Sequence, residues 1–432
     1  MQEKTPQHFL IKGIKKVEQK LNFPYNIFYH KNKRKNNMLN DDIIANLLNL
    51  SNLKTKKNFE NDKIIQFSGE TVCSEQVCPR CRKPTKKIHD YRMQTVKLAM
   101  FNTKQLQIAL KKRRYACSYC GKRFYEKYSF LPKYHQISNV MYAGIMNRLR
   151  QKSSLKDIAK DFGVSANTVF RTLKLISFSN KPSLPTILGI DEFKGNTGGE
   201  KYNVILANLE NNTISDILPT RKKTDLISYF MRYSREERNK VKVFVMDMHH
   251  NYKSIKWVFP SAEIVIDRYH FVRQVYFAMD AVRKRVQKEY SKDKILHFKN
   301  NRFAMWRNFG DLNDDLKTVL MRMLDHNGEL YSAWTFKEWF VDIKTLSDYD
   351  KAKTELHNWI VCAENENIPE FKKCLTAFKN WFGYILNSFK YKVSNGFTEG
   401  MNNNIKVLKR IAYGFKNFEN FRNRILLCFG NR

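Results

Sequence analysis

Two stretches decide the fold of this chain: TILGID at residues 186–191 and VKVFVMD at residues 241–247. Each is a run of apolar residues that ends in an aspartate, which is typical of a buried β-strand. Around them the pattern predicts strands at 202–207, 213–218 and 263–266, a helix at 223–233 and a short helix at 254–258. The order β-β-β-α-β-α-β indicates an α/β domain with a mixed sheet.

Three carboxylates suit metal chemistry. We expect Asp191 and Asp247 at the carboxyl ends of neighbouring strands, where they can share a cation, and Glu399 in the first turn of a helix that packs nearby. Oxygen ligands favour Mg²⁺ or Mn²⁺, and two such ions can activate the attacking oxygen and stabilise the leaving oxygen of a phosphodiester. The alternative is that each acid simply ends a strand or caps a helix.

A further acid and a histidine follow the last predicted strand. Asp267 is a rival second metal ligand, although we prefer Asp247 because it follows the more apolar strand. Asp267 and His270 can instead position the site or the DNA, or make only buried structural hydrogen bonds.

Four cysteines form two Cys-x-x-Cys pairs, Cys78 with Cys81 and Cys117 with Cys120. This spacing predicts four thiolates on one structural zinc ion, in a small β module with strands near 96–98 and 106–110. Basic residues such as Lys122 and Arg123 adjoin the second pair and suit contact with DNA. The alternative is a zinc staple without a contact role.

Residues 154–171 fit a helix-turn-helix. Gly163 lies at the turn, and Ser165 can cap the second helix through its hydroxyl. That helix would present polar side chains to the major groove: Asn167, Thr168, Arg171 and Lys174. A helical hairpin used only for packing is the alternative.

Composition points to the same partner. The 432 residues include 78 Lys and Arg against 41 Asp and Glu, a net charge of +37, so we expect a polyanion such as double-stranded DNA. No apolar run approaches the roughly 18 residues of a membrane span, and the first 20 residues do not have the apolar stretch of a signal peptide. We therefore expect a cytoplasmic protein without a membrane partner.

Together these motifs resemble the ISL3 family of bacterial insertion-sequence transposases. The resemblance covers about Met38 to Phe429, and several motifs occur in order. They are the two cysteine pairs with Gly121–Phe124, the helix-turn-helix around Gly163–Ser165, Leu188–Glu192, Val245–Met248, Asp267–His270, Glu399–Asn403 and Lys406–Phe415.

The resemblance implies a ribonuclease-H-like core with a DDE triad, which maps to Asp191, Asp247 and Glu399. It implies a transposase that binds terminal inverted repeats and target DNA, cleaves DNA and transfers strands, as a homodimer or higher oligomer. The long interval before Glu399 implies a helical insertion, and basic residues would hold the phosphate backbone: Lys406, Lys409 and Arg410. The alternatives are an inactive transposase-derived DNA-binding regulator and a ribonuclease-H-like nuclease without strand transfer.

The predicted organisation has seven parts. They are a basic extension at 1–37 that we expect to be disordered, a helical segment at 38–63, the zinc ribbon at 64–130, the helix-turn-helix at 131–182, the first part of the catalytic core at 183–280, the helical insertion at 281–384 and the final core helix at 385–432.

Overall fold

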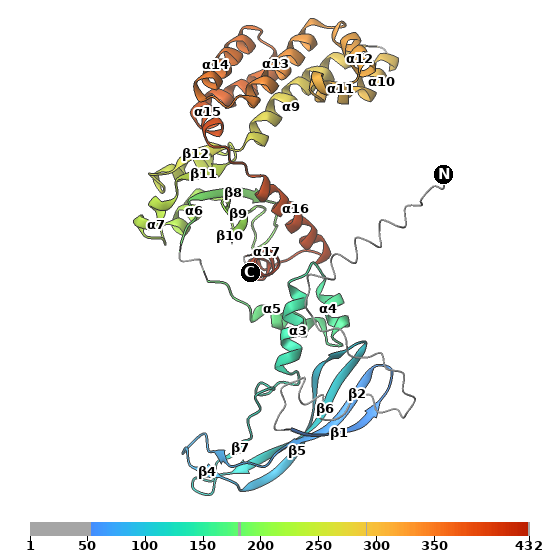
Figure 1. Cartoon of the computed structure of the whole chain (residues 1–432), viewed down its shortest axis with the longest axis vertical. Coiled ribbons are helices and arrows are strands. Elements are labelled where there is room, and N and C mark those ends of the chain that lie inside the picture. The colour runs from blue at the N-terminus through green and yellow to red at the C-terminus, as the bar shows by residue number, and fades with distance from the viewer. Residues whose placement is uncertain (1–52, 180–182, 291, 431–432) are drawn as a thin grey trace, which may run out of the picture. The chain divides into compact units, whose positions relative to one another are not determined.

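The computed structural model describes residues 53–179, 183–290 and 292–430 (Figure 1). The extension at 1–37 and most of the expected segment at 38–63 lie outside the described residues. Two compact units are present. One contains the described residues up to 59 together with 66–93 and 109–126, and the other contains 60–65, 94–108 and the chain from 127 onward.

A β module comes first in the described part of the chain. Its main sheet has the order β1-β2-β6-β5, with β7 on β6, and β3 pairs with β4 separately. The strands are β1 Leu53–Glu60, β2 Ile64–Thr71, β3 Gln76–Val77, β4 Pro84–Thr85, β5 Ile88–Phe101, β6 Lys104–Ala116 and β7 Arg123–Tyr125. The prediction of a helical segment up to residue 63 is therefore wrong for 53–60. Because Leu53 is the one buried side chain of β1, pairing with β2 defines this strand and its own apolar pattern does not.

Three short helices follow, each capped by a serine. They are α3 Asn139–Leu149, α4 Leu155–Asp161 and α5 Ala166–Lys174. Ser154 Oγ accepts the Asp157 backbone N–H and Ser165 Oγ accepts that of Thr168, which satisfies amide groups at each helix start. Gly163 between α4 and α5 has a φ of +58°, which a glycine adopts without strain. The predicted helix-turn-helix is thereby confirmed as a fold.

A five-stranded mixed sheet forms the next domain, in the order β10-β9-β8-β11-β12. Strands β8 to β10 are antiparallel neighbours, whereas β11 pairs in parallel with both β8 and β12. The strands are β8 Ile187–Phe193, β9 Asn203–Asn208, β10 Thr213–Leu218, β11 Val243–Met246 and β12 Glu263–Ile266. The helices between them are α6 Lys223–Phe230, α7 Arg235–Lys240, α8 His250–Lys253 and the 3-10 turn η2 Ser254–Trp257. This confirms the predicted ribonuclease-H-like α/β core.

A helical region interrupts the sheet domain after β12. Its helices are α9 Arg268–Val286, α10 Lys292–Asn300, α11 Arg302–Trp306, α12 Asp314–Leu324, α13 Gly328–Thr345, α14 Tyr349–Asn365 and α15 Lys372–Lys390. The predicted boundaries of the insertion, at 280/281 and 384/385, fall inside α9 and α15. Both helices therefore belong partly to the sheet domain and partly to the insertion. Asn387 of α15 donates to the Ile264 carbonyl at 2.7 Å, and one hydrophobic core runs from the sheet into these helices. None of the helices in the described ranges has the length and apolar character to cross a membrane.

Two final helices, α16 Gly396–Ile411 and α17 Phe418–Phe429, pack against the sheet domain. Arg424 of α17 is 1% exposed and donates to the carbonyl oxygens of Leu149, Gln151 (3.0 Å) and Ser153 (2.9 Å). One guanidinium thus satisfies the carbonyl group of the last residue of α3 and two carbonyl groups of the loop between α3 and α4.

We predict that Arg424→Ala destabilises the chain by on the order of 3 kcal/mol, because it leaves three carbonyl groups without their donor. Urea denaturation measures the change. Exposed Arg410→Ala is the matched control and should change the free energy of unfolding by less than about 0.5 kcal/mol. Equal effects of the two substitutions would contradict this role for Arg424.

Candidate active site

Three aspartates gather at the carboxyl edge of the parallel strands. Asp247 follows β11 directly and Asp267 follows β12 directly. Asp191 was expected at the end of its strand, but it lies within β8, opposite Ile205 of β9. The reason is that β8 extends further than β11. The pairing between the two strands ends at Val245 opposite Gly189, whereas β8 continues to Phe193. Asp191 therefore faces the space beyond the end of β11, where Asp247 lies.

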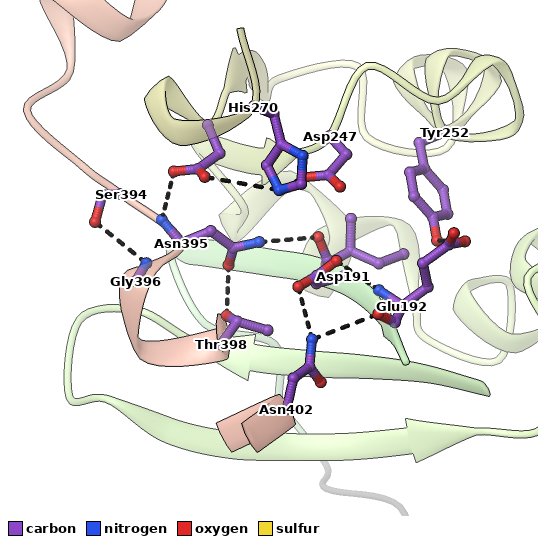
Figure 2. Close-up of polar contacts among 12 residues, drawn as sticks. Asp191, Glu192, Asp247, Tyr252, His270, Ser394, Asn395, Gly396, Thr398 and Asn402 are labelled. Atoms are coloured by element: carbon purple, nitrogen blue, oxygen red, sulfur yellow. Dashed lines mark hydrogen bonds and ion pairs between the residues drawn. The ribbon is translucent and has the colours of Figure 1, made fainter. Parts of the chain in front are cut away.

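A histidine links two of these acids (Figure 2). His270, in the first turn of α9, places Nε2 2.8 Å from Asp247 Oδ1 and 4.0 Å from Asp267 Oδ2. Asp267 is 4% exposed, and its Oδ1 accepts the backbone N–H of Asn395 at 2.9 Å. Asp267 thus joins β12 to the start of α16 and is positioned by that bond, in addition to its contact with His270.

The start of α16 is fastened to β8 by two buried asparagines (Figure 2). Asn395 Nδ2 donates to the Ile190 carbonyl at 3.3 Å, and Asn402 Nδ2 donates to Asp191 Oδ2 at 2.7 Å. Gly189 permits this approach, since a Cβ there would lie 3.0 Å from Asn395 Oδ1. The other Asp191 oxygen, Oδ1, accepts the Glu192 backbone N–H at 2.7 Å. Two hydrogen bonds therefore fix the orientation of the Asp191 carboxylate.

Glu399 lies in the first turn of α16, between these two asparagines, and its side chain is exposed. Its charge helps to raise the pKa of Asp267, so it is within electrostatic range of the site. Its carboxylate does not form a tight cluster with Asp191 and Asp247. Within the described residues, only the four cysteines form a group of three or more acidic, histidine or thiol ligands whose atoms all lie within 4.8 Å.

Burial and neighbouring charges shift the pKa values of three groups in the site. Burial, and next the nearby Asp247 carboxylate, raise the pKa of Asp191 to about 7, against the lowering effect of the Glu192 N–H. Burial also raises the pKa of Asp267. Burial would lower the pKa of His270, but its contact with Asp247 and the surrounding carboxylates raise it. In the folded chain both Asp191 and Asp267 are therefore harder to ionise than an ordinary aspartate.

A cavity of about 190 Å³ opens beside these residues. Asp247, His249 and His270 line it, together with Glu192 and Tyr252. Glu192 is already paired, because its carboxylate accepts Arg221 Nη1 at 2.6 and 2.8 Å and the Tyr252 hydroxyl at 3.5 Å.

Sequence reasoning missed the polar residues that support the acids: Glu192, Arg221, Tyr252, Asn395 and Asn402. Tyr252 and Arg221 lie far from Asp191 in the chain and carry no motif of their own. The one signal was the asparagine-rich start of the helix that holds Glu399.

The four predicted zinc ligands do meet in space. Cys78 Sγ lies 3.6 Å from Cys120 Sγ, and Cys81 Sγ lies 3.4 Å from Cys117 Sγ. A tetrahedral zinc with bonds of about 2.3 Å separates its sulfurs by about 3.8 Å, so the cluster fits this ion. Hydrogen bonding to the Cys120 backbone is the largest effect on Cys117 and lowers its pKa to about 6, which favours the thiolate that binds metal.

The two knuckles of this cluster have the same turn. The Cys78 N–H donates to the Lys83 carbonyl and the Cys117 N–H to that of Lys122, both at 3.0 Å. The turns need a positive φ, which Arg82 adopts at +59° and Gly121 at +69°.

The predicted DNA-contacting side chains are mostly at the surface. Exposed are Lys122, Arg123, Asn167, Arg171, Lys174, Lys406 and Arg410, whereas Thr168 is half-buried. Lys409 differs from the others. It is half-buried, its Nζ donates to the Lys194 carbonyl at 3.0 Å, and burial lowers its pKa. Lys409 therefore braces α16 against the loop after β8.

A four-cysteine cluster, a helix-turn-helix and a ribonuclease-H-like core with an acidic site together define a DNA-acting transposase. Family models agree along the chain. A transposase model matches residues 188–425, a zinc-finger model of the transposases of IS204, IS1001, IS1096 and IS1165 matches 74–120, and the helix-turn-helix model of the ISL3 transposases matches 126–174. The chain belongs to the ISL3 family of insertion-sequence transposases.

Two of the similar proteins are named as insertion-sequence transposases. The transposase for insertion sequence element IS1001 of Bordetella parapertussis is 24% identical over 368 residues, 82% of this chain and 88% of that protein. The transposase for insertion sequence element IS1557 of Mycobacterium tuberculosis is 27% identical over 125 residues, 29% of this chain and 28% of that protein. A stretch of 68 residues is 44% identical to a protein of Lactococcus lactis named an ATP-dependent protease, but it covers 16% of this chain and 22% of that protein.

We predict that Asp191→Asn stabilises the metal-free chain more at pH 8 than at pH 5. The Asp191 pKa is about 7 in the folded chain against an ordinary 3.8, so its ionisation opposes folding increasingly as pH rises between these values. Removing the charge should restore up to about 4 kcal/mol above pH 7 and less at pH 5. At both pH values the gain is reduced by about 1 kcal/mol, because the asparagine has one acceptor oxygen where Asp191 accepts two hydrogen bonds. Urea denaturation at both pH values measures this. Asp225→Asn, at an exposed acid, should show no such difference, and an equal gain from Asp191→Asn at both pH values would contradict the repulsion.

We predict that Cys117→Ser removes the bound zinc and unfolds residues around the knuckles, because three thiolates hold the ion less well than four. Metal analysis and hydrogen exchange measure the two effects. Exposed Cys362→Ser should keep one zinc per chain. A variant at Cys117 that retains its full zinc content would overturn the assignment.

Proposed function

We propose that this transposase cleaves the ends of its insertion sequence by metal-dependent hydrolysis and joins the freed 3′ ends to target DNA. Asp191, Asp247 and Glu399 are the proposed ligands of Mg²⁺ or Mn²⁺. We propose two ions, one for the attacking oxygen and one for the leaving oxygen. The family membership supports a transposase, and the residue roles are our inference from the site.

The observation that carries this proposal is the electrostatic conflict between Asp191 and Asp247. Asp191 is buried, held by hydrogen bonds on both oxygens, and has a pKa raised to about 7 by burial and by Asp247. A fold tolerates such a penalty where the acids have a cation to bind. Carboxylates are the hard oxygen donors that Mg²⁺ and Mn²⁺ prefer, so the donor set fits these ions.

The residues around the proposed metal site have separate roles. Asn402 orients Asp191, and His270 orients Asp247 through its 2.8 Å contact. Glu399 lies on α16, whose start is tied to β8 and to Asp267, and its side chain would turn towards the two aspartates when metal binds. Bound metal ions would supply an activated attacking oxygen and charge neutralisation at the leaving oxygen.

DNA recognition is assigned to the N-terminal modules. Asn167, Thr168, Arg171 and Lys174 of α5 would read bases in the inverted repeat, and Lys122 and Arg123 of the zinc ribbon would hold its backbone. Lys406 and Arg410 on the exposed side of α16 would bind phosphates close to the acids. Pairing two element ends requires at least a dimer of the chain on DNA.

A cleavage assay in Mg²⁺ tests the proposal, with a duplex that carries the inverted repeats flanking the gene. The wild-type chain should cut at the repeat ends and join them to target DNA, whereas Glu399→Gln should bind equally but lose about 10²- to 10³-fold in rate, as removal of a charge-stabilising group does. Exposed Glu419→Gln on α17 is the matched control and should retain activity. Tight binding without cleavage in either metal would instead support a regulator, and cleavage without joining would support a nuclease.

A further inference from the structure

We propose that the outward face of α9, with a cationic cavity at its far end, binds a single DNA strand that leaves the catalytic cavity. The strand's phosphates would lie on the cations of this path, and an unstacked base would lie against Trp306. This inference rests on the proposed function for its substrate, and it assigns a role to the helical insertion.

One face of α9 carries an exposed aromatic and cationic stripe. Tyr269, Arg273 and Phe277 are four residues apart, and Lys284 follows on the same face, all within about 80° around the helix. The rings of Tyr269 and Phe277 are 48% and 51% exposed. The Arg273 guanidinium lies over both, 5.4 and 5.2 Å from their centroids. Aromatic faces beside cations are what a single strand uses for stacking and phosphate contact.

This stripe joins two cavities. At one end Arg273 and Phe277 line the cavity that also contains Asp247 and His270. At the other, the Phe277 ring lies 6.0 Å from that of Trp306, which lines a second cavity of about 320 Å³. From Tyr269 to Lys284 the helix rises about 22 Å, the length of about six stacked nucleotides.

The second cavity is cationic. Arg283, Lys284, Lys299 and Arg302 line it, and Asp280 is its single carboxylate, which leaves three positive charges uncompensated. Arg283 is 3% exposed and lies 2.7 Å from Asp280 Oδ1, while Lys284 Nζ lies 2.8 Å from Oδ2. Asp280 and Gln287 hold the Arg283 guanidinium at the wall of the cavity, where its charge adds to the attraction for a phosphate.

Two of these cations remain available for a ligand. Where side chains are described, no ion pair neutralises Lys299 of α10 or Arg302 of α11, and both are exposed. Trp306 is held in place because its Nε1 donates to Asp280 Oδ1 at 3.2 Å and its ring lies 5.8 Å from that of Tyr276. Hence a fixed indole ring and unpaired cations share one cavity, which fits a nucleotide with its phosphate.

The test compares a blunt duplex of the element end with two tailed duplexes, each with a single-stranded tail of about six nucleotides on one of the two strands. Binding to the full-length Glu399→Gln chain, which should bind without cutting, is measured by fluorescence anisotropy at increasing salt. The variants added to it are Lys299→Glu with Arg302→Glu, and Trp306→Leu. The matched control reverses two exposed lysines of α14 outside the cavity, Lys351→Glu with Lys353→Glu.

The tail should tighten binding to the parent chain, and the Lys299 and Arg302 pair of substitutions should abolish this gain. The slope of log affinity against log salt for the tailed duplex should become shallower by about 0.7 for each phosphate that the variant no longer neutralises. Trp306→Leu should weaken tailed binding at least about fivefold and leave blunt binding unchanged, which also shows that the variant is folded. The control pair should keep the gain.

A tail that gives no gain, or an equal loss of affinity in the cavity and control variants, would overturn the inference. The outcome is separable from the proposed function. A wild-type chain that gains from the tail but never cuts in Mg²⁺ would leave the strand path standing and refute the catalytic proposal. A chain that cuts but gains no affinity from the tail would refute the strand path and leave the catalytic proposal standing.

Discussion

The burial of the Asp191 carboxylate beside that of Asp247 is the constraint on which the site depends. Asp191 lies within β8, and Asp247 directly follows β11, the parallel neighbour of β8, so the sheet holds the two acids close together and buries Asp191. Neighbouring side chains hold the three aspartates in place. Asn402 fixes Asp191, His270 faces Asp247, and Asp267 takes the N–H of Asn395. These contacts fix the aspartates before any ligand binds, whereas the exposed Glu399 side chain lies apart from them.

Short-range patterns predicted the parts of the molecule that local sequence determines. The apolar runs before Asp191 and Asp247 predicted β8 and β11, and the two Cys-x-x-Cys pairs predicted the sulfur cluster. Gly163 and Ser165 predicted the turn and cap of the helix-turn-helix. In each case the residues act on neighbours in the chain, or the spacing itself specifies the chemistry.

Long-range contacts decided what the sequence could not show. The bond from Asn402 to Asp191 joins residues 211 apart, and that from Asn395 to Asp267 joins residues 128 apart. Strand β1 has one buried residue and is defined by its partner, so its own pattern did not predict a strand. The position of Asp191 inside β8 follows from the different lengths of β8 and β11, which no single strand reveals. Glu399 was placed on the correct helix, while its approach to the aspartates stays a prediction.

Crystallography of the chain with Mn²⁺ bound tests the central claim most directly, because the anomalous signal locates the metal without reference to activity. The account predicts manganese between the carboxylates of Asp191 and Asp247, with the Glu399 side chain turned in to complete the ligands. Manganese held instead by Glu192 and His249 in the neighbouring cavity, or no manganese between the two aspartates, would contradict it.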